Sequence, residues 1–283
     1  MTSKQDEKVA ELFASLEKGV QEVYTSDKYR KYLDTMVKFH DYSARNCLLI
    51  LMQRPEASLV AGFNTWRNEF NRHVKKGEKA ITVIGGLQQK VTVEEADEKT
   101  NEKEKKEITF AKFFPCSVFD VSQTEGDDLQ SIADKLTGSV GGFQNLWEAL
   151  VALSPVPVEV GECGGANGFY RRGEAPFIRV QEGMSEQQAV KTLLHEIAHA
   201  TLHAGDDATG QRAREVEAES VAYVVSGHLG IDTSAYSFGY VAGWASGKEA
   251  KELQESADRI REAAHELIKA LGQGERETDI AAA

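Results

Sequence analysis

The pattern His195-Glu196-Ile197-Ala198-His199 constrains this chain more than any other short stretch of its sequence. Just before it, Ser185 and Gln188 have the spacing of a helix-capping box. Apolar side chains follow at helical spacing and form one face: Val190, Leu193, Leu194, Ile197, Ala198 and Leu202. Two histidines four residues apart on a helix lie one above the other, so both rings can reach one zinc ion. We therefore predict a Zn²⁺ site on an amphipathic helix.

Glu196 gives the predicted zinc site a possible reaction. A carboxylate beside the metal can accept a proton from zinc-bound water and pass it to a leaving amine, which is the chemistry of peptide hydrolysis. Average composition would produce the five-residue pattern in roughly one chain of this length in a hundred. The context supports it further, because a candidate edge strand precedes the helix and could bind an extended peptide.

Three glutamates on the next predicted helix compete to be the third zinc ligand. Glu215 and Glu219 share a face, whereas Glu217 is about 200° round the helix from Glu215. We predict Glu215 as the ligand, and Glu219 as the acceptor of the outer N–H of a zinc histidine. The alternative is that all three form a solvated acidic face.

Other residues of this half carry weaker signals. His203 lies one turn beyond His199, but three ligands and a water already complete a catalytic zinc site, so we expect a structural role. Tyr236 and Tyr240 could donate a hydroxyl to a developing oxyanion, with aromatic packing as the alternative for both, and Tyr240 is the candidate catalytic residue. The remaining histidines carry no comparable signal, apart from His228 as a helix C-terminal cap: His40, His73 and His265.

Charge is distributed unevenly along the 283 residues, whose net charge is −12. Residues 1–120 hold 20 basic and 19 acidic side chains, whereas residues 121–283 hold 13 and 26. Within residues 28–90 there are 12 basic and five acidic side chains, a local net charge of +7. That segment could face a polyanion, although the average over the whole chain argues against one.

The pattern of elements predicts an α+β fold in two domains, residues 1–125 and 142–283, joined by a linker at 126–141. In the first domain we expect helices over 5–25 and 27–53 and strands on both sides of a charged hairpin tip at 93–107. In the second we expect a helix over 143–153, a strand at 155–160, a hairpin at 166–181, and helices from 185, over 211–229 and over 247–271. No apolar run reaches a membrane span and no secretory signal is present, so we expect a cytoplasmic protein without a membrane partner.

With these residues identified, the second half resembles the ImmA/IrrE-type gluzincin metallopeptidases through HEIAHATLH (195–203) and EVEAESVAYVV (215–225). The first half resembles the N-terminal DNA-binding domain of ArdC-type antirestriction proteins. The matching residues are Tyr42-Ser43, Asn46, Leu48-Leu49-Ile50, Gln53, Pro55, Ala57, VAGF (60–63), Trp66, VKKGEKAI (74–81) and SVFDVSQTEG (117–126). The order of the two halves is also that of ArdC-like proteins.

The resemblance implies single-stranded DNA binding by the first domain and an association with plasmids, phages or other mobile genetic elements that evade host restriction. It also favours Glu215 as the third ligand. The chemistry of the first domain agrees, since cations can contact phosphates and aromatic rings can stack on unpaired bases. The candidate DNA-binding residues are Tyr42, Asn46, Phe63, Trp66, Arg67, Phe70, Arg72, Lys75, Lys76 and Lys79. For the aromatic residues the alternative is a place in the core, and for the cations it is a solvated surface.

The leading hypothesis is a single-stranded DNA-binding antirestriction protein with a zinc metalloendopeptidase domain of the gluzincin type. Its partners would be single-stranded DNA and an unidentified protein substrate. Two alternatives remain open. The protein could coat DNA and use zinc only structurally, or it could be a protease that cleaves a phage-type repressor.

Overall fold

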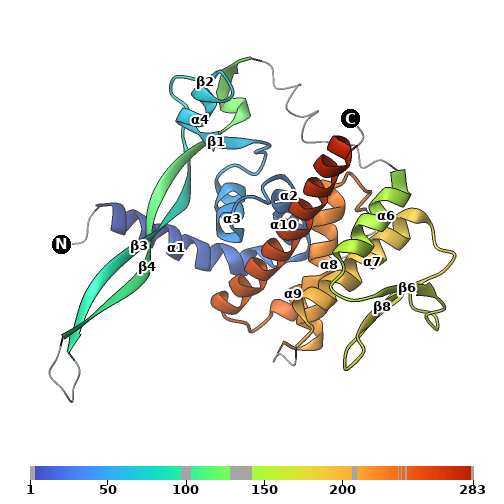
Figure 1. Cartoon of the computed structure of the whole chain (residues 1–283). Coiled ribbons are helices and arrows are strands. Elements are labelled where there is room, and N and C mark those ends of the chain that lie inside the picture. The colour runs from blue at the N-terminus through green and yellow to red at the C-terminus, as the bar shows by residue number, and fades with distance from the viewer. Residues whose placement is uncertain are drawn as a thin grey trace.

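The computed structural model describes residues 4–96, 103–127, 142–205 and 209–281, apart from 235, 237 and 240. It has the predicted mixture of helices and mostly antiparallel sheet, in two halves of the chain (Figure 1). Among the described residues, no helix combines the length and hydropathy needed to cross a bilayer.

The first half begins with three helices rather than the predicted two. These are α1 (Lys4–Val23), α2 (Ser26–Lys38) and α3 (Ala44–Gln53). The expected single helix over 27–53 is therefore wrong, because the chain turns between Phe39 and Ser43. The Ser43 hydroxyl accepts a hydrogen bond from the backbone N–H of Asn46 and so starts α3.

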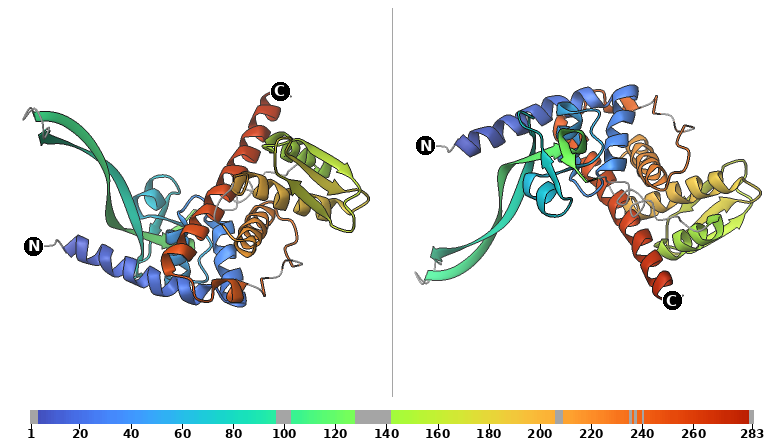
Figure 2. Two further views of the ribbon diagram at one scale, coloured as in Figure 1. Left: turned by 90° about the horizontal axis from the view of Figure 1, so that it is seen from below. Right: turned by 90° about the horizontal axis from the view of Figure 1, so that it is seen from above.

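A long antiparallel hairpin follows and projects away from the body of the molecule (Figures 1 and 2). Its strands are β3 (Ile81–Ala96) and β4 (Lys103–Asp120), and β1 (Val60–Gly62) pairs with the other side of β4. The expectation of a turn over 93–107 is wrong at the two ends of that segment. These ends belong to the strands, because Val93 pairs with Lys106 and Ala96 with Lys103. Residues 97–102, at the centre of that segment, lie outside the described residues.

A small subdomain caps the base of the hairpin. It consists of α4 (Phe63–Asn68), β2 (Arg72–Val74), the 3₁₀ turn η1 (Val121–Gln123) and β5 (Thr124–Gly126). Asp120, 2% exposed, holds it to the sheet because its carboxylate accepts from the backbone N–H groups of Ser58, Leu59 and Ser122.

The second half contains the predicted hairpin within a three-stranded sheet of order β6-β8-β7. β6 and β8 run parallel, and β7 and β8 run antiparallel, which leaves β7 at an edge. The elements are α6 (Gly142–Leu153), β6 (Val158–Gly161), β7 (Gly168–Arg171), β8 (Phe177–Gln181), α7 (Glu186–Leu202), α8 (Gln211–His228), α9 (Val241–Ala245) and α10 (Ala250–Ala281). α8 stops before Gly230, whose φ of +70° suits a glycine after a helix end.

The two halves share one hydrophobic core. α2 packs against α8, and α10 runs between the halves and contacts α1, α3, α7 and α8 (Figure 1). Buried hydrogen bonds cross this contact, from the Tyr24 hydroxyl to the Leu253 carbonyl at 2.8 Å and between the Tyr29 and Ser220 hydroxyls at 2.8 Å. The two halves are therefore held together by apolar packing and by buried hydrogen bonds.

Candidate metal centre

The two histidines of the His-Glu-x-x-His pattern lie on α7, the helix that packs between the small sheet and α8. Its first turn is capped by the Ser185 hydroxyl, which accepts from the Gln188 N–H. The buried face of α7, formed by Val190, Leu194 and Ile197, fixes the rotation of the helix. His195 and His199 then project to one side with their Nε2 atoms 3.0 Å apart.

α8 completes a three-residue cluster by bringing Glu215 to both imidazoles. One carboxylate oxygen lies 3.5 Å from Nε2 of His195 and the other 3.7 Å from Nε2 of His199. Ligands at zinc-bond lengths on a tetrahedral ion are about 3.4 Å apart. The nitrogen and oxygen atoms of His195, His199 and Glu215 could thus hold one metal ion, and two imidazoles with a carboxylate fit zinc.

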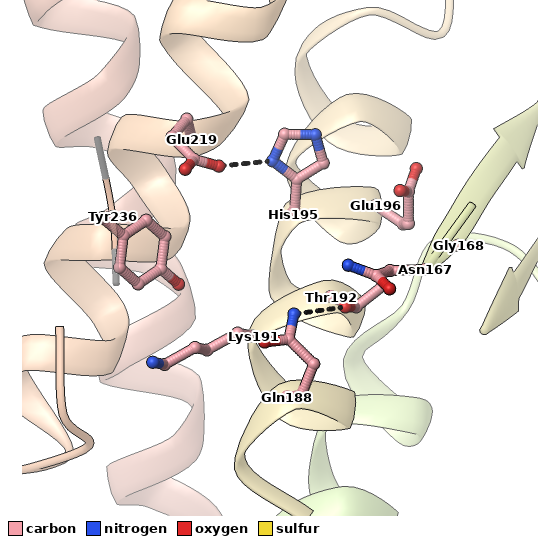
Figure 3. Close-up of a pocket in the computed structure, with 9 residues that line it drawn as sticks. All are labelled: Asn167, Gly168, Gln188, Lys191, Thr192, His195, Glu196, Glu219 and Tyr236. Atoms are coloured by element: carbon pink, nitrogen blue, oxygen red, sulfur yellow. Dashed lines mark hydrogen bonds and ion pairs between the residues drawn. The ribbon is translucent and has the colours of Figure 1, made fainter. Parts of the chain in front are cut away.

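Glu219, one turn further along α8, lies on the outer side of His195 (Figure 3). Its carboxylate is 3.1 Å from Nδ1 of His195, so that the Nε2 atom faces His199 and Glu215. Burial lowers the pKa of His195, but hydrogen bonding to Glu215 and Glu219 outweighs it and raises this pKa to about 10. The same contacts to His195 and His199 lower the pKa of Glu215.

Glu196 points away from α8 and toward the edge strand β7 (Figure 3). Its side chain is 6% exposed, and burial raises its pKa against the opposing effect of the two histidines. A raised carboxyl pKa suits a group that must first take up a proton and then release it. β7 approaches α7 closely at Gly168, where an added Cβ would meet Cγ2 of Thr192 at 2.6 Å and the Arg179 carbonyl oxygen at 3.0 Å.

Two hollows flank His195 and Glu196 along the edge of β7. One, of about 290 Å³, extends past Thr192 and Lys191 to Tyr236 (Figure 3). The other, of about 400 Å³, extends past Tyr170 to Arg172 and Arg214. Both hollows have Gly168, His195 and Glu196 in their linings, and we call the two together the cleft.

The free edge of β7 lines this cleft. β7 pairs only with β8 among the described strands, and Asn167 already accepts from the Gln181 N–H. In an antiparallel ladder the paired residues alternate, so the backbone groups of Gly168 and Tyr170 point away from β8. Glu196 interacts with the backbone of Tyr170 at this edge.

The structure places the remaining candidates of this half away from the ligand positions. Glu217 is fully buried on another side of α8, where it pairs with Arg259 of α10. His203 is 1% exposed, with Nε2 3.7 Å from Glu217. Tyr236 lies in the cleft wall, with its hydroxyl 3.2 Å from that of Ser226, and Tyr240 lies outside the described residues.

Comparison with known proteins agrees with the order of the two halves. Residues 3–119 match the N-terminal domain of anti-restriction factor ArdC, and residues 163–236 match the IrrE N-terminal-like domain, a peptidase family. The metal-free crystal structure of antirestriction ArdC protein from R388 plasmid shares the fold, with a TM-score of 0.51, 22% identity and coverage of 82% of this chain and 86% of that one. The chain is an ArdC-type protein.

Two further similarities accompany this ArdC-type assignment. The Mn(II)-bound structure of the R388 ArdC protein gives a TM-score of 0.49 at 18% identity, covering 82% of this chain and 84% of that chain. An uncharacterized protein of Bacillus anthracis is 28% identical over 273 residues, which represent 83% of this chain and 46% of the relative. The chain thus spans about half the length of that relative.

The ArdC N-terminal domain places the predicted DNA-binding residues in two groups. One group is structural. Trp66 is fully buried and its indole N–H donates to the Phe119 carbonyl at 2.8 Å, so the prediction that it stacks on a base is corrected to a core role. The Asn46 amide is engaged by the backbone N–H and carbonyl of Ile84, and the half-buried Tyr42 donates its hydroxyl to the Val60 carbonyl.

Two cations of the ArdC N-terminal domain also have local partners. Arg72 donates to Thr124 and to the Gly126 carbonyl, and Lys75 donates to the Ser122 carbonyl, so both tie β2 to η1 and β5. The ring of Phe70, which is half-buried, packs 5.0 Å from that of Trp66.

The second group is exposed. Phe63 is 50% exposed at the start of α4, and Arg67 lies one turn later on the same helix. Lys76 and Lys79 stand exposed in the loop between β2 and β3. We name these four residues the α4 surface; α4 and β2 pack together at the base of the hairpin (Figure 1).

Proposed function

We propose that this ArdC-type protein is a zinc-dependent peptidase that acts at single-stranded DNA and helps a mobile genetic element to evade restriction. The observation that carries the proposal is the cluster of His195, His199 and Glu215 beside the buried Glu196, in a cleft lined by an unpaired strand edge. Three protein ligands and an adjacent general base are the parts that a gluzincin site requires.

When bound, zinc supplies an acidified water and polarises the peptide carbonyl. Glu196 accepts the proton of that water and delivers it to the leaving amine. Glu219 holds His195 through its Nδ1 atom, so that Nε2 stays directed to the metal. Tyr236 lines the same cleft, and its hydroxyl is available to a substrate oxygen once it leaves Ser226.

The edge of β7 provides a binding mode for the substrate. An extended peptide can pair with the outward backbone groups of Gly168 and with the Tyr170 carbonyl, while the Tyr170 N–H faces Glu196, and so extend the sheet by one strand. Such a peptide would run along both hollows and pass its backbone in front of Glu196. The Arg172 side chain lines one hollow and favours acidic residues on that side of the scissile bond.

The α4 surface provides a binding mode for the DNA. Arg67, Lys76 and Lys79 can contact phosphates while Phe63 stacks on a base, and none of these contacts reads sequence. Binding of this kind brings the peptidase cleft to proteins that act on incoming DNA.

A transformation assay tests the combined function. DNA enters a restricting host that expresses the wild-type chain, Glu196→Gln, or Lys76→Gln with Lys79→Gln; Glu182→Gln, an exposed glutamate before α7, serves as the control. We expect protection with wild type and Glu182→Gln and its loss in the other two variants. Full protection by Glu196→Gln would contradict the role of proteolysis and favour DNA coating with a structural metal.

A further inference from the structure

A second group of side chains that could hold a metal ion lies between the two halves and shares no residue with the cluster on α7 and α8. It consists of His40 and Asp41, in the turn between α2 and α3, and His265 of α10. No sequence motif predicts it, because His40 and His265 are 225 residues apart and meet only in the folded chain.

The three side chains converge with the spacing of ligands on one ion. The Nδ1 atoms of His40 and His265 are 3.4 Å apart, and Oδ1 of Asp41 lies 3.7 Å from the first and 3.6 Å from the second. Ligands of a tetrahedral zinc ion are separated by about 3.4 Å. These distances are similar to those on α7 and α8, where the two Nε2 atoms are 3.0 Å apart and the two oxygens of Glu215 lie 3.5 and 3.7 Å from them.

The surroundings hold both imidazoles in place. His40 packs edge-to-face on His228 at the end of α8, with ring centroids 4.7 Å apart. Neutral imidazoles offer the lone pairs that a metal needs, and Asp41, 77% exposed, leaves a path from solvent.

We propose that His40, Asp41 and His265 form a second metal site, separate from the peptidase centre, for a zinc-class divalent ion. Two imidazoles and one carboxylate select ions of the zinc, cobalt and nickel group over magnesium or calcium, which prefer oxygen ligands alone. The bound ion links the turn at 39–43 to α10 and thereby fastens the ArdC N-terminal domain to the C-terminal half.

The site has a mechanical connection to both functional regions. The turn leads directly into α3, whose Asn46 holds β3 through Ile84. On the other side, α10 carries Arg259, which pairs with Glu217 of the same helix that bears Glu215. Occupancy at the His40–Asp41–His265 site thus stabilises the contact between the ArdC N-terminal domain and the C-terminal half.

Zinc titration of the metal-free full-length protein against a chromophoric chelator tests this site. We expect two ions per wild-type chain and one for His265→Gln. Asp41→Asn replaces the charged oxygen ligand at an exposed position, so its affinity for the second ion should be weaker by about tenfold or more. His73→Gln is the matched control, because His73 is an exposed histidine paired with Glu125, and it should still bind two.

A second background separates this site from the peptidase centre. His195→Gln with His199→Gln should retain one zinc ion, which raises the melting temperature and is lost when His265→Gln is added. Equal zinc binding by that double variant with and without His265→Gln would overturn the proposal and leave His40 and His265 as a hydrogen-bonded imidazole pair only. If only the His195–His199–Glu215 centre does not bind zinc, the wild-type protein should bind one ion, and His265→Gln should abolish that binding.

Discussion

The Glu219 carboxylate lies 3.1 Å from Nδ1 of His195, on the side of the imidazole opposite the metal cluster. A partner at this position fixes the tautomer of a ligating histidine and raises its basicity. We predict that Glu219→Ala lowers zinc affinity at the peptidase centre by about 10- to 100-fold. Chelator competition measures this, with Glu182→Gln as the control; unchanged affinity would show that Glu219 does not support His195.

Zinc binding at the peptidase centre should depend on pH through His195. Its pKa of about 10 in the metal-free chain means that the imidazole carries a proton at neutral pH, which the metal must displace. Affinity should therefore rise with pH up to about 10 and fall in acid. Calorimetry in buffers of different ionisation enthalpy should detect about one proton released per ion at pH 7. If no proton is released, His195 is not protonated beside Glu215 and Glu219 in the metal-free chain.

Asp120 should matter for stability and not for metal binding. Its backbone and hydroxyl donors lower its pKa although burial alone would raise it. A lowered folded-state pKa gives stability that is complete above the unfolded-state value and is lost as pH falls through the folded-state value. We predict that Asp120→Asn costs about 1–3 kcal/mol at pH 7 and less in acid. Urea unfolding at both pH values, with Glu56→Gln as an exposed control, tests this.

Phe63 and Trp66 should separate DNA affinity from stability. Phe63→Ala should weaken binding of a single-stranded oligonucleotide by about 1–3 kcal/mol if its exposed ring stacks on a base. Trp66→Phe should leave this affinity unchanged and lower the melting temperature, since it removes a buried hydrogen bond to Phe119. Fluorescence anisotropy measures the affinity for the oligonucleotide. Unchanged affinity in Phe63→Ala together with weaker affinity in Trp66→Phe would contradict the α4 surface as the DNA site.

Gly168 should be required for the cleft. A Cβ there would lie 2.6 Å from Thr192 and 3.0 Å from the Arg179 carbonyl oxygen, so Gly168→Ala must displace β7 from α7. We expect a loss of about 1–3 kcal/mol in stability and a fall in peptide affinity. Gly183→Ala is not a neutral comparison because its φ is +75°. Gly243→Ala, where nothing lies within 4 Å of the added Cβ, is the appropriate control.

The sequence predicted what depends on local periodicity. The spacing of His195 and His199 implies one face of a helix, and the phase of Glu215 and Glu219 on the next helix implies a shared side. The break between α2 and α3 was missed because apolar spacing continues through residues 39–43, and only the Ser43 cap marks the new helix. The spacing of apolar residues identifies the buried face of a helix, but it does not show where one helix ends and the next begins in a new direction.

Features that depend on tertiary packing could not be predicted. In the sequence, an aromatic residue of the core looks the same as one that stacks on a DNA base. Only the burial of Trp66 in the folded chain shows that it belongs to the core. The charged residues near 93 and 106 resemble a solvated turn, yet the hairpin register extends through them. His40 and His265 meet because α10 packs across the first half of the chain.

In the proposed reaction Glu196 acts as the general base at the His195–His199–Glu215 centre. Mass spectrometry of a peptide library incubated with the zinc-loaded full-length protein, with and without a single-stranded oligonucleotide, tests it most directly. We predict cleavage by the wild-type chain and none by Glu196→Gln, although that variant binds as much zinc as wild type. Equal cleavage by Glu196→Gln, or no cleavage by the zinc-loaded wild-type chain in either condition, would contradict the account.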